Sequence, residues 1–185
     1  MATQTRSAGT INNDASYGTT AWVNTSNALS SNNTYSTATS SQVNSQYLKC
    51  TNFGFSIPVG STINGIQVNV ERKSNDTSES SVKDSRVRLV KGGTIQTTDK
   101  ADTTNAWATS DTVKQYGSSG DTWGDSWSST DINASDFGMV ISAYPSGFFI
   151  FGVWEPSVAS VDHIEITIDY TPPPSTSTKA TIIII

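Results

Sequence analysis

Alternation of apolar and polar residues is the feature that most constrains how this chain can fold. Within residues 64–73, Ile66, Val68 and Val70 share one parity, and polar side chains lie between them. Successive side chains of a β-strand point to opposite faces, so this pattern is typical of a half-buried antiparallel strand. Residues 85–90 and 161–170 alternate in the same way, whereas helical periodicity is almost absent.

Turn signals separate these stretches about every ten residues. Pro58 and Gly60 indicate one turn, and Gly92 with Gly93 indicates another. Residues 137–144 are expected to form a buried strand, and residues 148–154 a nearly continuous apolar one. Eight to ten short strands with polar connections predict an all-β fold, a single antiparallel β-sandwich of the jelly-roll type.

The two ends of the chain differ from the middle. We expect an extended N-terminal arm over residues 1–8, the β-sandwich domain over residues 9–171, and a Pro-rich linker with an Ile-rich C-terminal strand over residues 172–185. Three consecutive prolines make the linker extended and semi-rigid. The tail then contains Ile182, Ile183, Ile184 and Ile185. An exposed run of this kind promotes aggregation, so we expect it to dock on its own domain or to add as a strand to a neighbouring subunit.

Composition narrows the class of partner. The net charge is −5, and charged residues make up 15% of the chain. Binding to nucleic acid or to an anionic membrane needs clustered Lys and Arg, so neither partner is expected. A surface rich in Ser and Thr, together with a polar N-terminus that does not resemble an export signal, favours a virion component.

Few residues can carry catalytic chemistry. The chain has one cysteine, Cys50, and one histidine, His163, and these are too few for a typical zinc site or an activated thiol. Carboxylates gather in the loop segment 121–136, where Asp131 and Asp136 form a weak candidate for calcium. We expect no enzyme activity and no cofactor.

Two loop tryptophans, Trp123 and Trp127, lie four residues apart. One interpretation is that both rings close one end of the hydrophobic core. The other is that they stack on a sugar ring and contact a cell-surface glycan.

Four segments together carry a family resemblance. They are NFGFSIPVGSTINGIQVNVERK (52–73), SRVRLVKGG (85–93), WGDSW followed by DINASDFGMV (123–127 and 131–140), and VDHIEITIDY (161–170). In this combination the chain resembles β-sandwich structural proteins of tailed bacteriophages and prophages over roughly residues 9–171. The resemblance implies a role on the virion surface or tail, and it brings no catalytic motif.

These observations lead to one expected function and two alternatives. The expected function is a non-enzymatic structural subunit of a phage virion, either a capsid decoration protein or a tail component. It would bind copies of itself and other virion proteins through sheet edges and terminal strands. The alternatives are a carbohydrate-binding module that uses the loop tryptophans, and a subunit of an extracellular filament joined by strand exchange.

Overall fold

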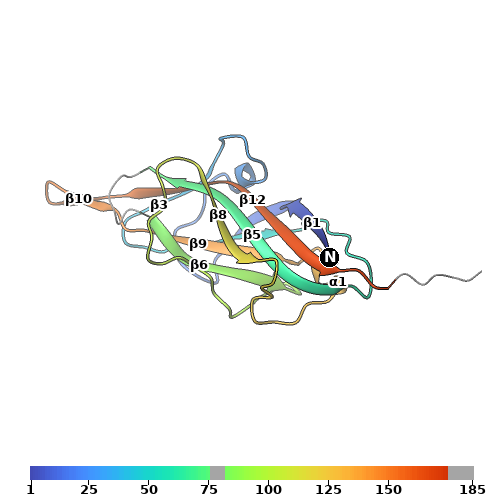
Figure 1. Cartoon of the computed structure of the whole chain (residues 1–185). Helices are drawn as coiled ribbons and strands as arrows, with labels where there is room; N and C mark the ends of the chain where they lie inside the picture. Colours follow the sequence, from blue (N-terminus) through green and yellow to red (C-terminus); the bar gives the residue numbers. More distant parts are fainter. Residues whose placement is uncertain (76–81, 175–185) are drawn as a thin grey trace, which may run out of the picture.

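Two antiparallel β-sheets packed against each other form the body of the protein (Figure 1). The computed structural model describes residues 1–75 and 82–174. Every pairing between the named strands of these residues is antiparallel. The all-β sandwich expected from the sequence is therefore confirmed, while its jelly-roll connectivity stays a prediction.

The first sheet is organised around its longest strand, β12 (Ser157–Thr171). Its order is β1-β12-β5-β8, with β1 (Ala2–Ser7), β5 (Thr62–Ser74) and β8 (Thr112–Ser118). A further strand, β3 (Ser36–Ser40), pairs with the first residues of β12, whereas β1 pairs with its later residues. One long strand thus connects both ends of this sheet.

The second sheet has the order β2-β4-β9-β6-β7. Its strands are β2 (Thr10–Asp14), β4 (Tyr47–Thr51), β9 (Gly138–Pro145), β6 (Val82–Lys91) and β7 (Thr94–Ile95). Among the described residues, two short helices lie outside the sheets: the 3-10 helix η1 (Thr25–Ala28) and α1 (Ser129–Asn133).

The core lies between the sheets and follows the alternation read from the sequence. Ile66, Val68 and Val70 of β5 are fully buried. They belong to one cluster with the inward residues of β6, Val87 and Leu89. The intervening side chains of both strands are only partly buried. The sequence therefore predicted correctly which face of these strands is buried.

The N-terminal residues form a strand rather than an extended arm. Residues 2–7 pair along their whole length with residues 165–170 of β12. Ala8 is buried, and its backbone N–H donates to the carbonyl of Ile164 at 3.2 Å. The edge of β12 offers free backbone donors and acceptors here, and the polar N-terminal segment satisfies them.

The apolar segment 148–154 also does not form the one continuous strand that the sequence predicts. It folds into a separate hairpin of β10 (Phe148–Ile150) and β11 (Val153–Glu155). The reason is its turn, where Phe151 and Gly152 both have positive φ (48° and 85°). Two positive φ values are the requirement of the tight hairpin turn that matches strand twist, and glycine supplies one of them at little cost.

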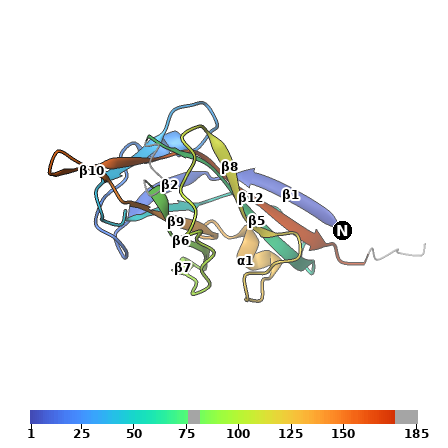
Figure 2. The same ribbon diagram turned by 60° about the vertical axis from the view of Figure 1, so that its left-hand side comes forward.

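The hairpin and the end of β12 lie at opposite ends of the molecule. Both views place β10 at one extremity, away from the sheets, and the last residues of β12 at the other, on the side of α1 (Figures 1 and 2). The described chain leaves this second end through the exposed or half-buried residues Pro172, Pro173 and Pro174.

Candidate functional site

The β10–β11 hairpin gathers five exposed apolar side chains within residues 149–154. Phe151 at its tip is 98% exposed, Phe149 is 61% exposed and Trp154 is 49% exposed. Ile150 and Val153 are also exposed. The stretch 145–156 contains one charged residue, Glu155. Contiguous exposed apolar surface of this kind makes the hairpin a candidate interaction site.

The hairpin is apolar on both of its faces. Phe149 pairs with Trp154, and the next pair along the ribbon is Ile150 with Val153. Neighbouring pairs on a two-stranded ribbon point to opposite sides. The rings of Phe149 and Trp154 lie 5.3 Å apart, centroid to centroid, on one side. A partner would therefore have to cover two faces and not one.

The expected interfacial residues Ile182, Ile183, Ile184 and Ile185 lie outside the described residues. The described chain ends at Pro174, three residues after β12. Pro173 lies near the turn before β5, because a Cβ added to Gly60 would come within 3.6 Å of its Cβ. The chain therefore leaves the sandwich beside the β4–β5 connection.

The loop tryptophans are core residues. Trp123 is 2% exposed and Trp127 is 9% exposed. The indole N–H of Trp123 donates to the carbonyl of Ile66 at 2.8 Å, and the Trp127 ring packs edge-on against Phe137. This agrees with the interpretation that both rings close the end of the core. Neither ring offers an open face on which a sugar could stack.

The two carboxylates considered for calcium have separate surroundings. Asp131 belongs to α1, where it accepts hydrogen bonds from the backbone and hydroxyl of Ser128 in a capping box. Asp136 lies in the connection after α1, on the side of Gly93. Within the part of the chain that the structure describes, no three His, Cys, Asp or Glu side chains gather as metal ligands would.

His163 lies in the middle of β12. Its Nε2 is 2.8 Å from the hydroxyl oxygen of Ser7 in the neighbouring strand β1, and its register partner on the other side is Glu71 of β5. The histidine therefore contributes to the pairing of strands. The single cysteine, Cys50, is fully buried in the core between the sheets.

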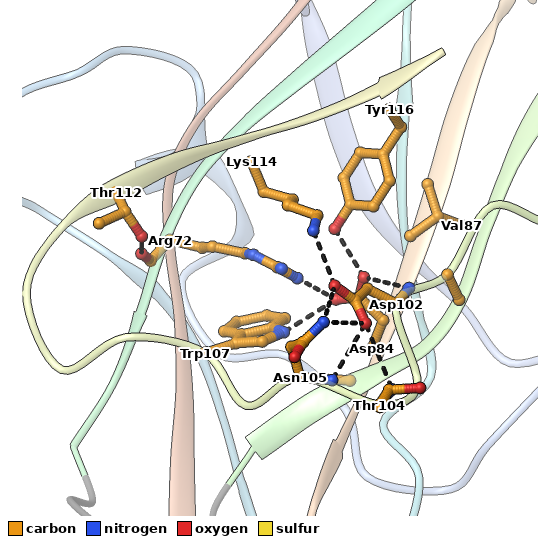
Figure 3. Close-up of polar contacts among 12 residues, drawn as sticks. Arg72, Asp84, Val87, Asp102, Thr104, Asn105, Trp107, Thr112, Lys114 and Tyr116 are labelled. Atoms are coloured by element: carbon orange, nitrogen blue, oxygen red, sulfur yellow. Dashed lines mark hydrogen bonds and ion pairs between the residues drawn. The ribbon is translucent and has the colours of Figure 1, made fainter.

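A buried charge cluster, composed of Arg72, Asp84, Trp107 and Tyr116, connects the two sheets (Figure 3). All four residues are buried. Asp84 in β6 of the second sheet is ion-paired with Arg72 in β5 of the first. Figure 3 shows the side chains converging on the Asp84 carboxylate from β5, β8 and the β7–β8 connection.

The carboxylate of Asp84 is saturated with donors. Besides Arg72, it accepts the indole N–H of Trp107 at 2.8 Å and the hydroxyl of Tyr116 at 2.7 Å. The backbone N–H of Asp102 donates a fourth bond at 2.8 Å. Burial raises the pKa of the Tyr116 phenol, so its proton stays in place as a donor. With four donors and no contact with water, this carboxylate is held in place and is not available to a substrate.

The guanidinium of Arg72 is covered by aromatic rings. It lies 4.4 Å from the ring centroid of Trp107 and 5.7 Å from that of Tyr116. Cation–π contacts and a paired carboxylate compensate the cost of removing this charge from water. The cluster fixes the long β7–β8 connection to both sheets, and this is a structural role.

An open depression of about 340 Å³ lies on the second sheet. Its lining residues are Ser16, Tyr17, Tyr47, Arg86, Arg88 and Ile95. The rings of Tyr17 and Tyr47 lie 5.2 Å apart. Both arginines pair with one carboxylate, Asp99, at 3.4 Å and 3.1 Å. The depression therefore combines aromatic surface with a net positive charge, because the one carboxylate of Asp99 neutralises only one of the two guanidinium groups.

Comparison with known proteins adds no relative. No protein-family model, curated protein or solved structure matches the chain. Within residues 1–75 and 82–174, no helix has the length and apolar character that crossing a membrane requires.

The sequence pointed to some of these features and missed others. Arg72 has the same parity as Ile66, Val68 and Val70, so its burial could have been foreseen. Its partner Asp84 could not, because a β-bulge between Asp84 and Arg86 interrupts the alternation of β6. The sequence held one indication of the exposed hairpin, the Phe151-Gly152 pair at its turn.

Proposed function

We propose that this protein is a non-enzymatic structural subunit of a bacteriophage virion, either a capsid decoration protein or a tail component. The observation that carries the proposal is the β10–β11 hairpin, which exposes Phe149, Phe151 and Trp154 at one end of the molecule. Water disfavours such a surface, so its burial against neighbouring subunits drives assembly. The resemblance to tailed-phage β-sandwich proteins supplies the setting of a virion.

Two further observations support a mechanical role. The buried charge cluster joins the sheets without presenting a reactive group, because the Asp84 carboxylate accepts four donors. The N-terminal strand β1 also stabilises the fold, since it pairs with the edge of β12 over six residue pairs. Both features favour a durable building block.

Light scattering tests whether the chain assembles. The intact chain and a variant that lacks residues 179–185 are compared over a range of protein concentrations. We expect the intact chain to form species larger than a monomer and the shortened chain to form fewer or none. Equal assembly by both chains would contradict the role proposed for Ile182, Ile183, Ile184 and Ile185.

The depression on the second sheet favours a second candidate function, the binding of an acidic cell-surface glycan. Arg88 and Arg86 would bind a sugar carboxylate, and the ring of Tyr17 would cover an apolar sugar face. Its volume of about 340 Å³ suits a single sugar residue. This function is compatible with a virion role, because surface proteins of virions can bind host cells.

A glycan array with neutral and carboxylated sugars tests this second candidate. We expect signals from the carboxylated sugars only, and their loss in the variant Arg88→Met. The exposed Arg6→Met variant is the matched control and should bind as the intact chain does. An array without signal, or one unaffected by Arg88→Met, would contradict it.

A further inference from the structure

The hairpin exposes a large apolar surface. Aromatic side chains can bury about 150–250 Å² each, and the fractional exposures of Phe149, Phe151 and Trp154 give about 300–500 Å² for these three, to which Ile150 and Val153 add. The largest apolar patch of a typical monomeric protein is about 300–600 Å² and is often a functional surface. The size of this patch therefore fits an interaction surface.

The hairpin also exposes its backbone. β10 and β11 form a sheet of two strands only, and neither strand pairs with a third strand among the described residues. An outer edge of this kind is a template for an added strand. The partner should therefore be an extended segment that is apolar on both of its sides.

The tail of the chain has the required composition. Isoleucine is β-branched and favours extended backbone. In a strand, Ile182 and Ile184 face one side while Ile183 and Ile185 face the other. Such a strand is apolar on both sides, as the hairpin is.

The strand that begins at Ile182 lies too close in sequence to the end of β12 to pair along the hairpin of its own molecule. The hairpin directly precedes β12, and the tail follows its far end at Thr171, so all fifteen residues of β12 separate them. A strand of this length spans about 50 Å. Residue 182 lies eleven residues beyond Thr171 and can be at most about 40 Å from it, even if the chain turns straight back. The hairpin extends further still from β12 (Figures 1 and 2).

We propose that the Ile182–Ile185 strand of one copy adds to the β10–β11 hairpin of a second copy. This inference rests on the proposed function as a self-assembling subunit and names the two surfaces that meet. Pro172, Pro173 and Pro174 form a stiff, extended connection after β12, which disfavours a tight reversal of the chain. Donor and acceptor lie at opposite ends, so the contact joins copies head to tail. Such a heterologous contact produces a ring or an open filament.

Mixing two complementary full-length variants tests the contact. In the first, Phe149→Asp and Phe151→Asp disable the hairpin and leave the tail intact. In the second, Ile183→Asp and Ile184→Asp disable the tail and leave the hairpin intact. Each variant alone should be a monomer, and an equimolar mixture should give a species of twice the monomer mass that does not grow further. Size-exclusion chromatography with light scattering measures these masses.

A matched control separates this contact from general surface hydrophobicity. Val113 on β8 is exposed to the same extent as Phe149, and the variant Val113→Asp should assemble as the intact chain does. Unfolding curves of all variants check that they are folded, since each substitution lies on an exposed side chain or in the tail.

Four results would overturn the inference. Assembly of the hairpin variant would mean that the tail docks elsewhere, and the proposed structural role would survive. Association of the tail variant, but not of the hairpin variant, would indicate contact between two hairpins. An intact chain that stays monomeric at every concentration, or that binds neutral lipid vesicles through the hairpin instead, would overturn the inference and remove self-assembly from the proposed function.

Discussion

The rings of Phe149 and Trp154 pack at a tilt across the β10–β11 hairpin, with their centroids 5.3 Å apart, yet about half or more of each side chain remains exposed. A cross-strand aromatic pair stabilises a hairpin by only about 0.2–1 kcal/mol. An isolated two-stranded ribbon is marginal in water. The pair therefore holds the proposed binding surface in shape and does not by itself account for the exposed apolar area.

Tryptophan fluorescence should report the state of this hairpin. Trp22, Trp107, Trp123 and Trp127 are buried, and Trp154 is the half-exposed one. We expect acrylamide to quench mainly Trp154, so that Trp154→Phe removes most of the quenchable emission while Trp22→Phe does not. Raising the protein concentration should protect Trp154 as copies associate. Strong quenching that persists in Trp154→Phe would show that the core tryptophans are accessible.

Breaking the buried charge cluster should destabilise the fold severely. Asp84→Asn leaves the Arg72 charge buried without its partner, and such a change costs about 3–5 kcal/mol. Urea unfolding measures the free energy. The matched control is Asp125→Asn, which removes a partly exposed carboxylate 3.6 Å from Lys91 and should cost about 1 kcal/mol or less. Similar losses in both variants would contradict the structural role of the cluster.

The carboxylate of Asp162 holds a distant loop. It accepts the backbone N–H groups of Asn32 at 3.1 Å, Asn33 at 2.9 Å and Thr34 at 3.1 Å. Asp162→Ala should leave these donors without their partner and cost about 1–3 kcal/mol. We expect amide hydrogen exchange to accelerate at these three residues more than in β5 or β9. Unchanged protection at the loop would show that other contacts hold it.

Acid should weaken the contact between Asp102 and Lys114. The hydrogen bond from Lys114 at 2.7 Å, followed by those from Asn105, holds the pKa of the Asp102 carboxyl well below its usual range. A carboxyl whose pKa is lower in the folded chain than in the unfolded chain stabilises the fold. This stabilisation is fully present at pH values above the unfolded pKa of about 3.9, and it is lost as the pH falls toward the folded pKa.

Comparing Lys114→Met with the intact chain between about pH 2 and pH 6 measures this contribution. We expect a smaller decrease in stability upon acidification in the variant. Some decrease should remain, because Asp14 also has a lowered pKa, chiefly through hydrogen bonds from Ser16. A variant as sensitive to acid as the intact chain would contradict the assignment.

Strand alternation was sufficient to predict the sandwich and its buried faces. The period of two places Ile164, Ile166 and Ile168 of β12 in the core, and all three are fully buried. The prediction works because one face of each sheet must be buried, so the parity of the apolar residues determines which face of a strand points to the core.

The candidate site depends on features that alternation does not encode. An apolar run such as 148–154 reads as a buried strand, and only the backbone conformation at Phe151 and Gly152 turns it into an exposed hairpin. A polar segment such as residues 2–7 shows no strand pattern in the sequence, because pairing at a sheet edge uses the backbone and needs no apolar side chains. The sequence therefore predicted an arm. The position of Trp123 and Trp127 in a loop likewise did not decide between core and surface.

Electron microscopy of particles labelled with an antibody against this protein tests the proposed virion role. Particles are purified from a lysate of the host that carries the gene, and an antibody against the sandwich domain is detected with gold. If the protein is a virion subunit, label should appear at regularly repeated positions on phage heads or tails. Label confined to the soluble fraction, with unlabelled particles, would contradict a virion role.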